Sequence, residues 1–217
     1  MLAWDVYLAF FGVAVLLALS PGPDNLFVLM QSIQRGPAVG IAVVRGLCLG
    51  IGVHTLAVAL GLAAVIAASP IALTAMKYCG AAYLLYLAWG AWRAPVQVQQ
   101  TPSPQNLEAY PRLGWSEDLR WVRRGMVMNL TNPKVLIFFL ALLPQFADPM
   151  RGAVAVQILF LGCTFMLATF LVFGAIAYCS GWFGALLQRS ARAQRWLNRM
   201  AALVFVGLAV RLALLQQ

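Results

Sequence analysis

The stretch LALSPGPDNLFVLM, residues 17–30, places two prolines, a glycine and a carboxylate inside an apolar segment that begins near the start of the chain. A second stretch, MNLTNPKVLIFFLALLPQF at residues 128–146, is also apolar, breaks at a proline, carries an adjacent charge and becomes apolar again. Proline lacks a backbone N–H and disrupts the helical hydrogen bond one turn earlier. Backbone groups freed in this way are tolerated in a membrane only where protein buries them or where they line a wet cavity. We therefore expect two membrane helices that are broken at functional positions.

The composition is typical of a membrane protein. Of the 217 residues, 63% are hydrophobic and only 10% are charged, whereas soluble domains are about 45–50% apolar and about 25% charged. The basic residues behind the net charge of +9 lie mainly between apolar segments, so they indicate membrane orientation and not a nucleic-acid partner. No positively charged region precedes the small residues at 18–20, and we interpret the first segment as a permanent membrane helix and not a cleaved signal peptide.

Six apolar segments are long enough to cross a bilayer, which needs about 20 residues per helix. They cover residues 3–30, 38–67, 70–93, 121–145, 153–182 and 197–215. The polar, proline-rich stretch between the third and fourth segments, residues 94–120, is expected to be an irregular cytoplasmic loop with room for a short surface helix. We predict a single membrane domain over 1–217, with a first repeat at 1–93 and a second repeat at 121–217.

Arginines set the expected orientation of the chain in the bilayer. Most of them lie in the first, third and fifth connections between the segments, and few lie in the other two. The positive-inside rule therefore places these three connections in the cytoplasm and both termini outside. Small residues four apart, such as Gly36 and Gly40, favour close helix contacts and are compatible with a homodimer.

The two broken segments occupy corresponding positions in the two halves of the chain. With three segments in each half, the second half enters the membrane upside down relative to the first. Aligning Pro23 with Pro133 places Asp24 on Lys134. Secondary transporters build sites near the bilayer midplane from inverted repeats whose discontinuous helices correspond in this way. The predicted fold is an all-α integral membrane protein with six transmembrane helices as two inverted three-helix repeats, the first and fourth helices being broken at the proline motifs.

A new helix is expected to start after each break. Gly22 or Ser20 precedes Pro23 as a cap, and Asn132 precedes the second proline in the same way. A helix start offers unpaired N–H groups and the positive end of the helix dipole, which suit a carboxylate ligand. A lysine is disfavoured at such a position by about 0.3–1 kcal/mol, so other groups must hold Lys134 there.

Charges at the bilayer centre are costly, so Asp24 and Lys134 need an explanation. One hypothesis is a site for a zwitterion, in which Asp24 binds an ammonium group while Lys134 and the helix starts bind a carboxylate. The alternatives are that the two charges only pair with each other, or that the Lys134 side chain extends to a membrane interface. The other residues predicted to bind substrate are Gly22, Asn25, Asn129, Thr131 and Asn132, and the predicted structural breaks are Pro21, Pro23 and Pro133.

Protons are the predicted coupling ion. Asp24 is the only carboxylate expected deep in the membrane, and a desolvated carboxylate tends to keep its proton, so protonation would alternate with ammonium binding. His54, the only histidine, is the other candidate for proton coupling.

We expect neither an enzyme nor a protein that holds a cofactor or metal. The chain has no hydrolase or phosphate-binding motif, and its four cysteines are dispersed through apolar segments. A membrane carrier of thiol redox equivalents would need cysteines beside the proline breaks, and there are none.

The motifs resemble those of the LysE/RhtB amino-acid exporters. The resemblance rests on SPGPDN at 20–25 followed by Val28, Gly36 and Gly40, on NLTNPKVLIFFLALLPQF at 129–146, and on KYCGAAYLLYLAWGAWR at 77–93. It spans nearly the whole chain. The shared-motif positions it implies are Pro21, Gly22, Pro23, Asn132, Pro133 and Lys134.

This resemblance implies a small bacterial inner-membrane protein that exports amino acids or close derivatives, such as homoserine and its lactone, by proton antiport. It leaves the substrate open, because members with different substrates share these motifs. The alternative is an exporter of small cations or metal ions with a related fold. Such a pathway should carry several membrane carboxylates or histidines, whereas this chain has about one of each.

Overall fold

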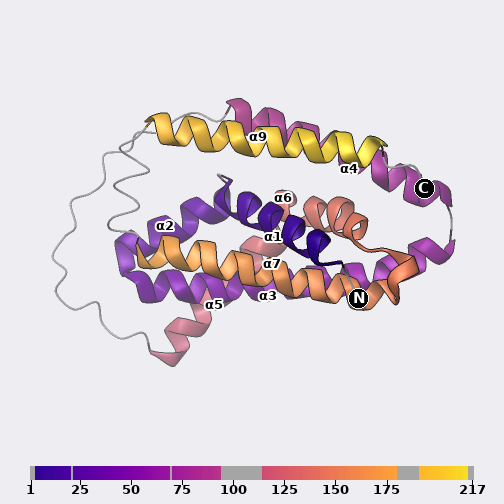
Figure 1. Cartoon of the computed structure of the whole chain (residues 1–217). Helices are drawn as coiled ribbons and strands as arrows, with labels where there is room; N and C mark the ends of the chain where they lie inside the picture. The colour runs from indigo at the N-terminus through magenta and orange to yellow at the C-terminus, as the bar shows by residue number, and fades with distance from the viewer. Residues whose placement is uncertain (1–2, 21, 69, 94–113, 180–190, 215–217) are drawn as a thin grey trace.

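The computed structural model describes residues 3–20, 22–68, 70–93, 114–179 and 191–214, and every element in these ranges is a helix (Figure 1). The long helices are α1 (Trp4–Leu19), α2 (Pro23–Arg35), α3 (Pro37–Ala68), α4 (Pro70–Arg93), α5 (Trp115–Leu130), α7 (Val154–Tyr178) and α9 (Ala191–Leu214). The short elements are α6 (Pro133–Ile137), the π-helix η1 (Phe138–Leu142) and the 3₁₀ helices η2 (Leu143–Phe146) and η3 (Pro149–Arg151). The predicted all-helical class is therefore confirmed.

Both breaks lie where the proline motifs predict them. The axis bends by 61° between α1 and α2, and by 56° between α5 and the Pro133–Phe146 segment. Pro23 and Pro133 each occupy the first turn of the new helix, where the missing N–H costs nothing. Pro21, the third predicted break residue, lies outside the described residues.

Within the described ranges, Pro37–Gly61 and Val154–Tyr178 are each long and apolar enough to cross a membrane alone. Each bent pair passes the same test as one broken span, which gives up to four spans. Helices of 24 residues, α4 and α9, occupy the positions of the third and sixth expected segments. The fourth segment starts earlier than expected: α5 begins at Trp115, inside the stretch expected to be a loop, with two carboxylates in its first turn that favour a helix start.

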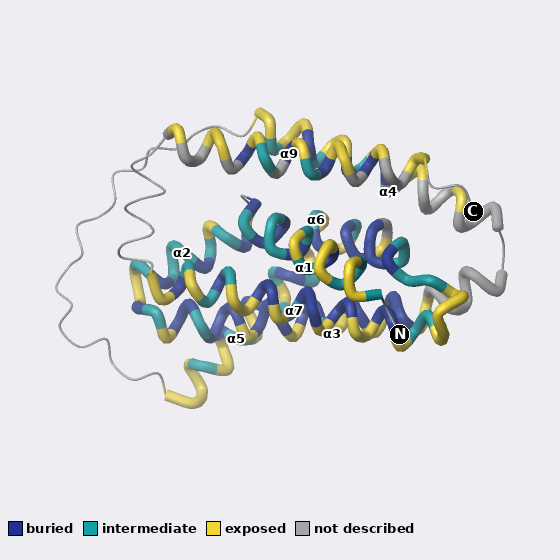
Figure 2. Tube along the Cα trace, in the orientation of Figure 1, coloured by how far each residue is buried: buried dark blue, intermediate teal, exposed yellow. Residues whose placement is uncertain are grey.

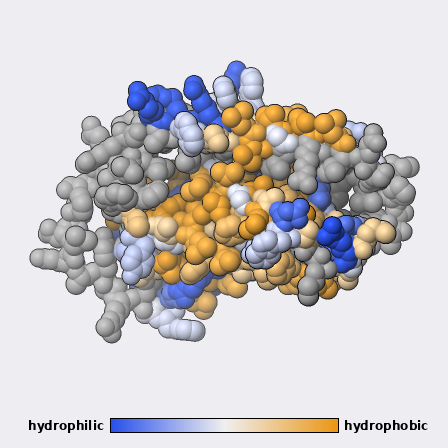
Figure 3. Space-filling view, in the orientation of Figure 1, coloured by the Kyte–Doolittle hydropathy of each residue, from blue (hydrophilic) through white to orange (hydrophobic). Residues whose placement is uncertain are grey.

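The helices pair in a definite pattern. Helix α3 packs mainly on α5 and α7, α1 packs on α7, and α4 packs on α9 along one side of the molecule (Figure 1). Much of α3 and α7 is buried, whereas α4 and α9 turn exposed faces outward (Figure 2). Apolar residues cover the middle of the visible face and hydrophilic residues gather toward its edges (Figure 3). This is the surface expected of a protein whose middle lies in lipid.

Two glycines let α3 and α5 touch backbone to backbone. A Cβ atom at Gly46 would lie 2.0 Å from the carbonyl oxygen of Val122, and one at Gly125 would lie 2.2 Å from that of Val43. At Gly50, one turn further along α3, a Cβ atom would lie 2.6 Å from Oδ1 of Asn129, so no larger side chain fits there. The side chain of glycine is a single hydrogen atom, which lets the two helix backbones come this close. The contact fixes the end of α5 against the centre of α3.

The ends of the described helices group at two opposite ends of the molecule (Figure 1). The α2–α3 junction, the start of α5, the end of α7 and the start of α9 lie toward one end of the molecule (Figure 1). The start of α1 and the end of α9 lie toward the other (Figure 1). Arg45 of α3 is exposed and forms an ion pair with Asp118 of α5.

Candidate functional site

The two breaks face one another around a small internal cavity. Residues from α2, α3, α5, α6, α7 and the end of α1 line it: Leu17, Ala18, Gly22, Asp24, Asn25, Ile51, Asn129, Asn132, Lys134, Val135, Phe165, Thr169 and Phe173. Six of the seven residues predicted to bind substrate are among them. The tertiary structure thus brings together two motifs that are more than 100 residues apart.

Lys134 reaches across from the second motif to the first. Its Nζ donates to the backbone oxygens of Leu17, at 3.0 Å, and Ser20, at 2.9 Å. These carbonyls belong to the last turn and C-cap of α1, whose carbonyl groups have no partner further along the helix. The C-terminal end of a helix carries partial negative charge and attracts a cation. The end of α1 is therefore what holds Lys134 at the unfavourable start of α6.

Asp24 and Lys134 do not form a direct ion pair. Within the described residues, the pairs with N···O within 4.0 Å are Arg45–Asp118 and Arg151–Asp148. Lys134 nevertheless lies close enough to act on Asp24 electrostatically, and the side chains of Asn129 and Asn132 lie beside the carboxylate. The simple alternative, in which the two charges satisfy only each other, does not describe this geometry.

Two acceptor oxygens in the site have no hydrogen-bond partner among the described residues. They are Oδ1 of Asp24 and Oδ1 of Asn129, in residues that are 5% and 2% exposed. A buried polar atom without a partner costs about 1–3 kcal/mol, and more when it is charged. Such atoms persist where a function requires them. The site therefore presents two unused acceptors side by side with one carboxylate charge.

The two helix starts differ. The side chain of Asn132 accepts from the backbone N–H of Lys134, so the start of α6 is capped from within. Gly22 caps α2 with no side-chain hydrogen bond. A Cβ at Gly22 would lie 3.6 Å from Nζ of Lys134. The start of α2, and not that of α6, is thus the one that faces the lysine with its N–H groups uncapped by a side chain.

Of the remaining predicted residues, Asn25 lines the cavity and Thr131 does not. Nδ2 of Asn25 donates to the oxygen of Ala18 at 2.7 Å, which ties α2 to the end of α1. Thr131 is exposed and its hydroxyl turns back to the oxygens of Val127 and Met128, so its contact with substrate stays a prediction. A threonine at a helix end commonly bonds its own preceding turn.

His54 is buried next to the site but does not line the cavity. Its Nε2 lies 3.4 Å from the backbone oxygen of Asn129, and its ring packs 5.7 Å from that of Phe139. It contacts Asn129, which does line the cavity. His54 thus packs against α5, and its role in proton coupling stays a prediction.

Sequence reasoning missed one wall of the cavity. Phe165, Thr169 and Phe173 stand at i, i+4 and i+8 on α7, and Ile51 faces them from α3. Nothing in an apolar helix sets these positions apart, because core and cavity faces have the same spacing. The π-helix η1 that follows α6 was also not expected; such turns occur frequently at functional sites.

The cavity holds a volume of about 20 Å³. One water molecule needs roughly 10–15 Å³ of such a cavity. An amino acid is several times larger. The residues that line the site must therefore separate before a substrate of that size can bind.

Comparison with known proteins identifies the chain. The family model described as LysE type translocator matches residues 15–216. The chain belongs to this family. An uncharacterised membrane protein of Pseudomonas aeruginosa is 32% identical over 92% of this chain and 90% of its own length. No solved structure gives a significant match.

Other relatives of this LysE-type translocator have names that state a transport function. The homoserine/homoserine lactone efflux protein of Salmonella typhimurium is 35% identical over 74% of this chain and 72% of its own length. The leucine efflux protein of Salmonella choleraesuis is 26% identical over 94% of this chain and 92% of its own length. The family and these relatives are transporters and not enzymes, and the apolar helices make this chain a membrane protein.

Proposed function

We propose that this LysE-type translocator exports amino acids or close derivatives, of the homoserine, threonine or lactone type, across the bacterial inner membrane by proton antiport. The observation that carries the proposal is the cavity between the two breaks. A single anion, two unpaired acceptor oxygens and a single lysine ammonium converge on it from both halves of the chain. This is the chemistry that a zwitterion with one ammonium and one carboxylate requires.

The ammonium of the substrate binds between Asp24 and Asn129. Their Oδ1 atoms are buried acceptors without a partner, and an ammonium group supplies three N–H donors. Binding would satisfy both oxygens and neutralise the carboxylate at once. A proton bound to Asp24 also neutralises the carboxylate, so substrate and proton compete for one site. That competition is the basis of antiport.

The carboxylate of the substrate binds at Lys134 and the start of α2. The lysine ammonium has three donors, of which two are used by Leu17 and Ser20. The third is left for a substrate oxygen, and the start of α2 at Gly22 contributes its N–H groups. Asn25 and Asn132 hold the two helix starts in place through their own hydrogen bonds.

The architecture proposed for this site is six spans in two inverted repeats, 1–93 and 121–217, within one domain. The helix pairing supports it: α3 and α7 pack together as second helices, and α4 and α9 as third helices of their halves. The contacts of α3 with α5 have their counterpart in those of α7 with α1. The α2–α3 junction and the starts of α5 and α9, where arginines lie, are toward one end of the molecule (Figure 1), which supports a cytoplasmic position for that end and an outside position for both termini.

Transport in this scheme alternates between openings toward the two sides. The cavity is too small for an amino acid, and the breaks between α1 and α2 and between α5 and α6 are the places where the half-helices turn relative to each other. Gly40 packs inside the chain, against Ser32 and Ala177. The proposed homodimer therefore uses a surface other than the one at Gly40.

The direct test is efflux from proteoliposomes loaded with labelled leucine, homoserine and homoserine lactone, with an acidic exterior. We expect at least one of them to leave faster than from protein-free vesicles, and unlabelled substrate outside to exchange with it. If none of these compounds, nor any other amino acid in a wider panel, shows protein-dependent efflux, the proposal is overturned.

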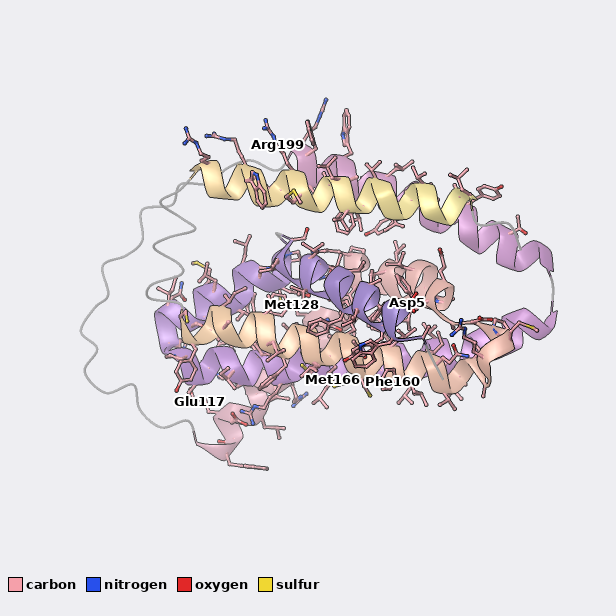
Figure 4. All side chains as sticks on the ribbon, viewed as in Figure 1. Asp5, Glu117, Met128, Phe160, Met166 and Arg199 are labelled. Atoms are coloured by element: carbon pink, nitrogen blue, oxygen red, sulfur yellow. The ribbon has the colours of Figure 1, made fainter. Side chains whose placement is uncertain are left out.

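Asp24→Asn tests the coupling role separately. The amide keeps the size of the side chain but has no charge, so we expect loss of one charge-assisted hydrogen bond and a fall of roughly 10–100-fold in efflux driven by a pH gradient. Asp5→Asn is the matched control, because Asp5 is exposed in the first turn of α1, far along the helix from the break (Figure 4). Normal pH-driven efflux by Asp24→Asn would show that Asp24 does not carry the proton.

Export of a metal ion is not favoured by any contact. Among the described residues, no group of three or more His, Cys, Asp or Glu side chains is placed to hold a metal ion. The donors around the cavity are one carboxylate and neutral amides, together with a lysine that repels cations.

A further inference from the structure

A second, larger pocket lies between α2 and α5 and has its own set of lining residues. Its volume is about 500 Å³, and it is open to the surface. Three arginines line it, Arg120, Arg123 and Arg124, together with the apolar residues Phe27, Val127 and Met128. None of these side chains lines the cavity between the breaks.

The arginines share one face of α5. Residues 120, 123, 124 and 127 are spaced i, i+3, i+4 and i+7, so their side chains stand above one another along the helix. Like charges at this spacing repel each other. Among the described residues, Arg120 and Arg123 have no ion-pair or ring partner, and both are exposed. The pocket therefore concentrates positive charge that the described part of the chain does not balance.

The two acids that the structure describes at the start of α5 form no ion pair with these arginines. Asp118 pairs with Arg45 of α3, and Glu117 is in none of the ion pairs of the described residues. A fourth cation is close by: Arg35 of α2 stacks on the Trp121 ring at 5.2 Å, and Arg124 stacks on the same ring at 4.8 Å. The indole holds Arg124 in place at the pocket wall.

The order of residues along the pocket resembles a membrane interface. Helix α5 runs from Glu117 at the edge of the molecule to Met128 nearer the bundle (Figure 4). Along it the charged residues come first and the apolar residues follow one turn later, so charge meets apolar surface within about 10 Å. A soluble anion would contact only the arginines. A lipid would contact the arginines with its headgroup and the apolar residues with its acyl chain.

We propose that this pocket binds the phosphodiester headgroup of an anionic phospholipid. The guanidinium groups of Arg120 and Arg123 donate to the phosphate oxygens, a geometry for which arginine is suited. The first part of an acyl chain lies along Val127 and Phe27. Basic pockets between helices on the cytoplasmic side of membrane proteins suit such headgroups. The bound lipid balances the charge at the start of α5 and buries its apolar face.

The test is native mass spectrometry of the purified protein in neutral detergent, titrated with phosphatidylglycerol or with phosphatidylcholine of the same chains. We expect wild type to prefer phosphatidylglycerol, and Arg120→Gln/Arg123→Gln to lose roughly 30-fold of that preference. The matched control is Arg192→Gln/Arg195→Gln. It removes the same charge from two exposed positions on α9, which, as the label of Arg199 shows, lies across the molecule from Glu117 (Figure 4).

Each contrary outcome overturns the proposal. An equal loss in the α9 variant would show that net charge alone attracts the lipid. Displacement of the lipid by millimolar inorganic phosphate would show a site for free anions. Should Arg120→Gln/Arg123→Gln fail to fold, Val127→Asp serves in its place, because it sets a carboxylate among the three arginines. Unchanged phosphatidylglycerol binding by that folded variant would contradict the proposal.

Discussion

Lys134→Met is expected to abolish export, with a fall of about 100-fold or more, and to lower the stability of the protein. Methionine fills the same space, but it leaves the carbonyls of Leu17 and Ser20 without their donor. It also removes the one cation among the described residues that line the cavity of Asp24. Leaving one buried charge without compensation costs about 3–5 kcal/mol. Efflux of labelled substrate and the midpoint of thermal unfolding in detergent measure the two effects.

The double variant Asp24→Asn/Lys134→Met separates charge from backbone contacts. Because neither charge remains, we expect it to recover part of the stability that Lys134→Met loses, but none of the transport. Arg45→Met is the control, because it also replaces a cation by methionine but lies outside the cavity, on α3. The half-exposed ion pair of Arg45 with Asp118 contributes at most about 1 kcal/mol to stability. Export at the normal rate by Lys134→Met would contradict the site proposed above.

Gly125→Ala is expected to destabilise the fold by about 3 kcal/mol or more, at the upper end of overpacking effects. The new methyl group would lie 2.2 Å from the carbonyl oxygen of Val43 and 3.2 Å from Cα of Gly46. Both are backbone atoms, so no side chain can turn away. Helices α3 and α5 must move apart, which displaces Asn129 from the cavity. Thermal unfolding followed by size-exclusion chromatography in detergent measures the loss.

Gly46→Ala should have an equally large effect, since its methyl group would lie 2.0 Å from the carbonyl oxygen of Val122. The two glycines serve one contact, so the double variant should lose less than the sum of the single variants. Gly61→Ala is the matched control on the same α3 helix, because nothing lies within 4 Å of the added methyl group. If Gly125→Ala unfolds at the same temperature as Gly61→Ala, the close backbone contact is not present.

Much of the site was predictable because its signals are local. A proline without an N–H ends one helix and opens the next wherever it lies, so the breaks before Pro23 and Pro133 follow from the sequence. A capping asparagine before a proline predicts the start of α6, and the side chain of Asn132 caps it. The charges of Asp24 and Lys134 stand out for the same reason: they lie in apolar stretches.

Local signals were not enough where an answer depended on a neighbour from another helix. Thr131 has the same local setting as Asn132, but the turn that ends α5 points its hydroxyl back into its own helix. Phe165, Thr169 and Phe173 lie on an apolar helix whose faces look alike until α3 packs beside it. The early start of α5 was hidden because its first turns are charged, whereas the apolar signal begins only with the buried Trp121.

The sequence by itself determined that this chain is a helical membrane protein with two proline breaks, a carboxylate after one and a lysine after the other. These are consequences of composition, chain stiffness and the cost of charge in lipid. Only the tertiary structure decided what each charge meets. Lys134 bonds the open end of α1 instead of Asp24, and Asp24 keeps an unpaired oxygen beside Asn129. The physical reason is that a helix end offers its carbonyl groups only to what folding brings there, and that partner comes from more than 100 residues away.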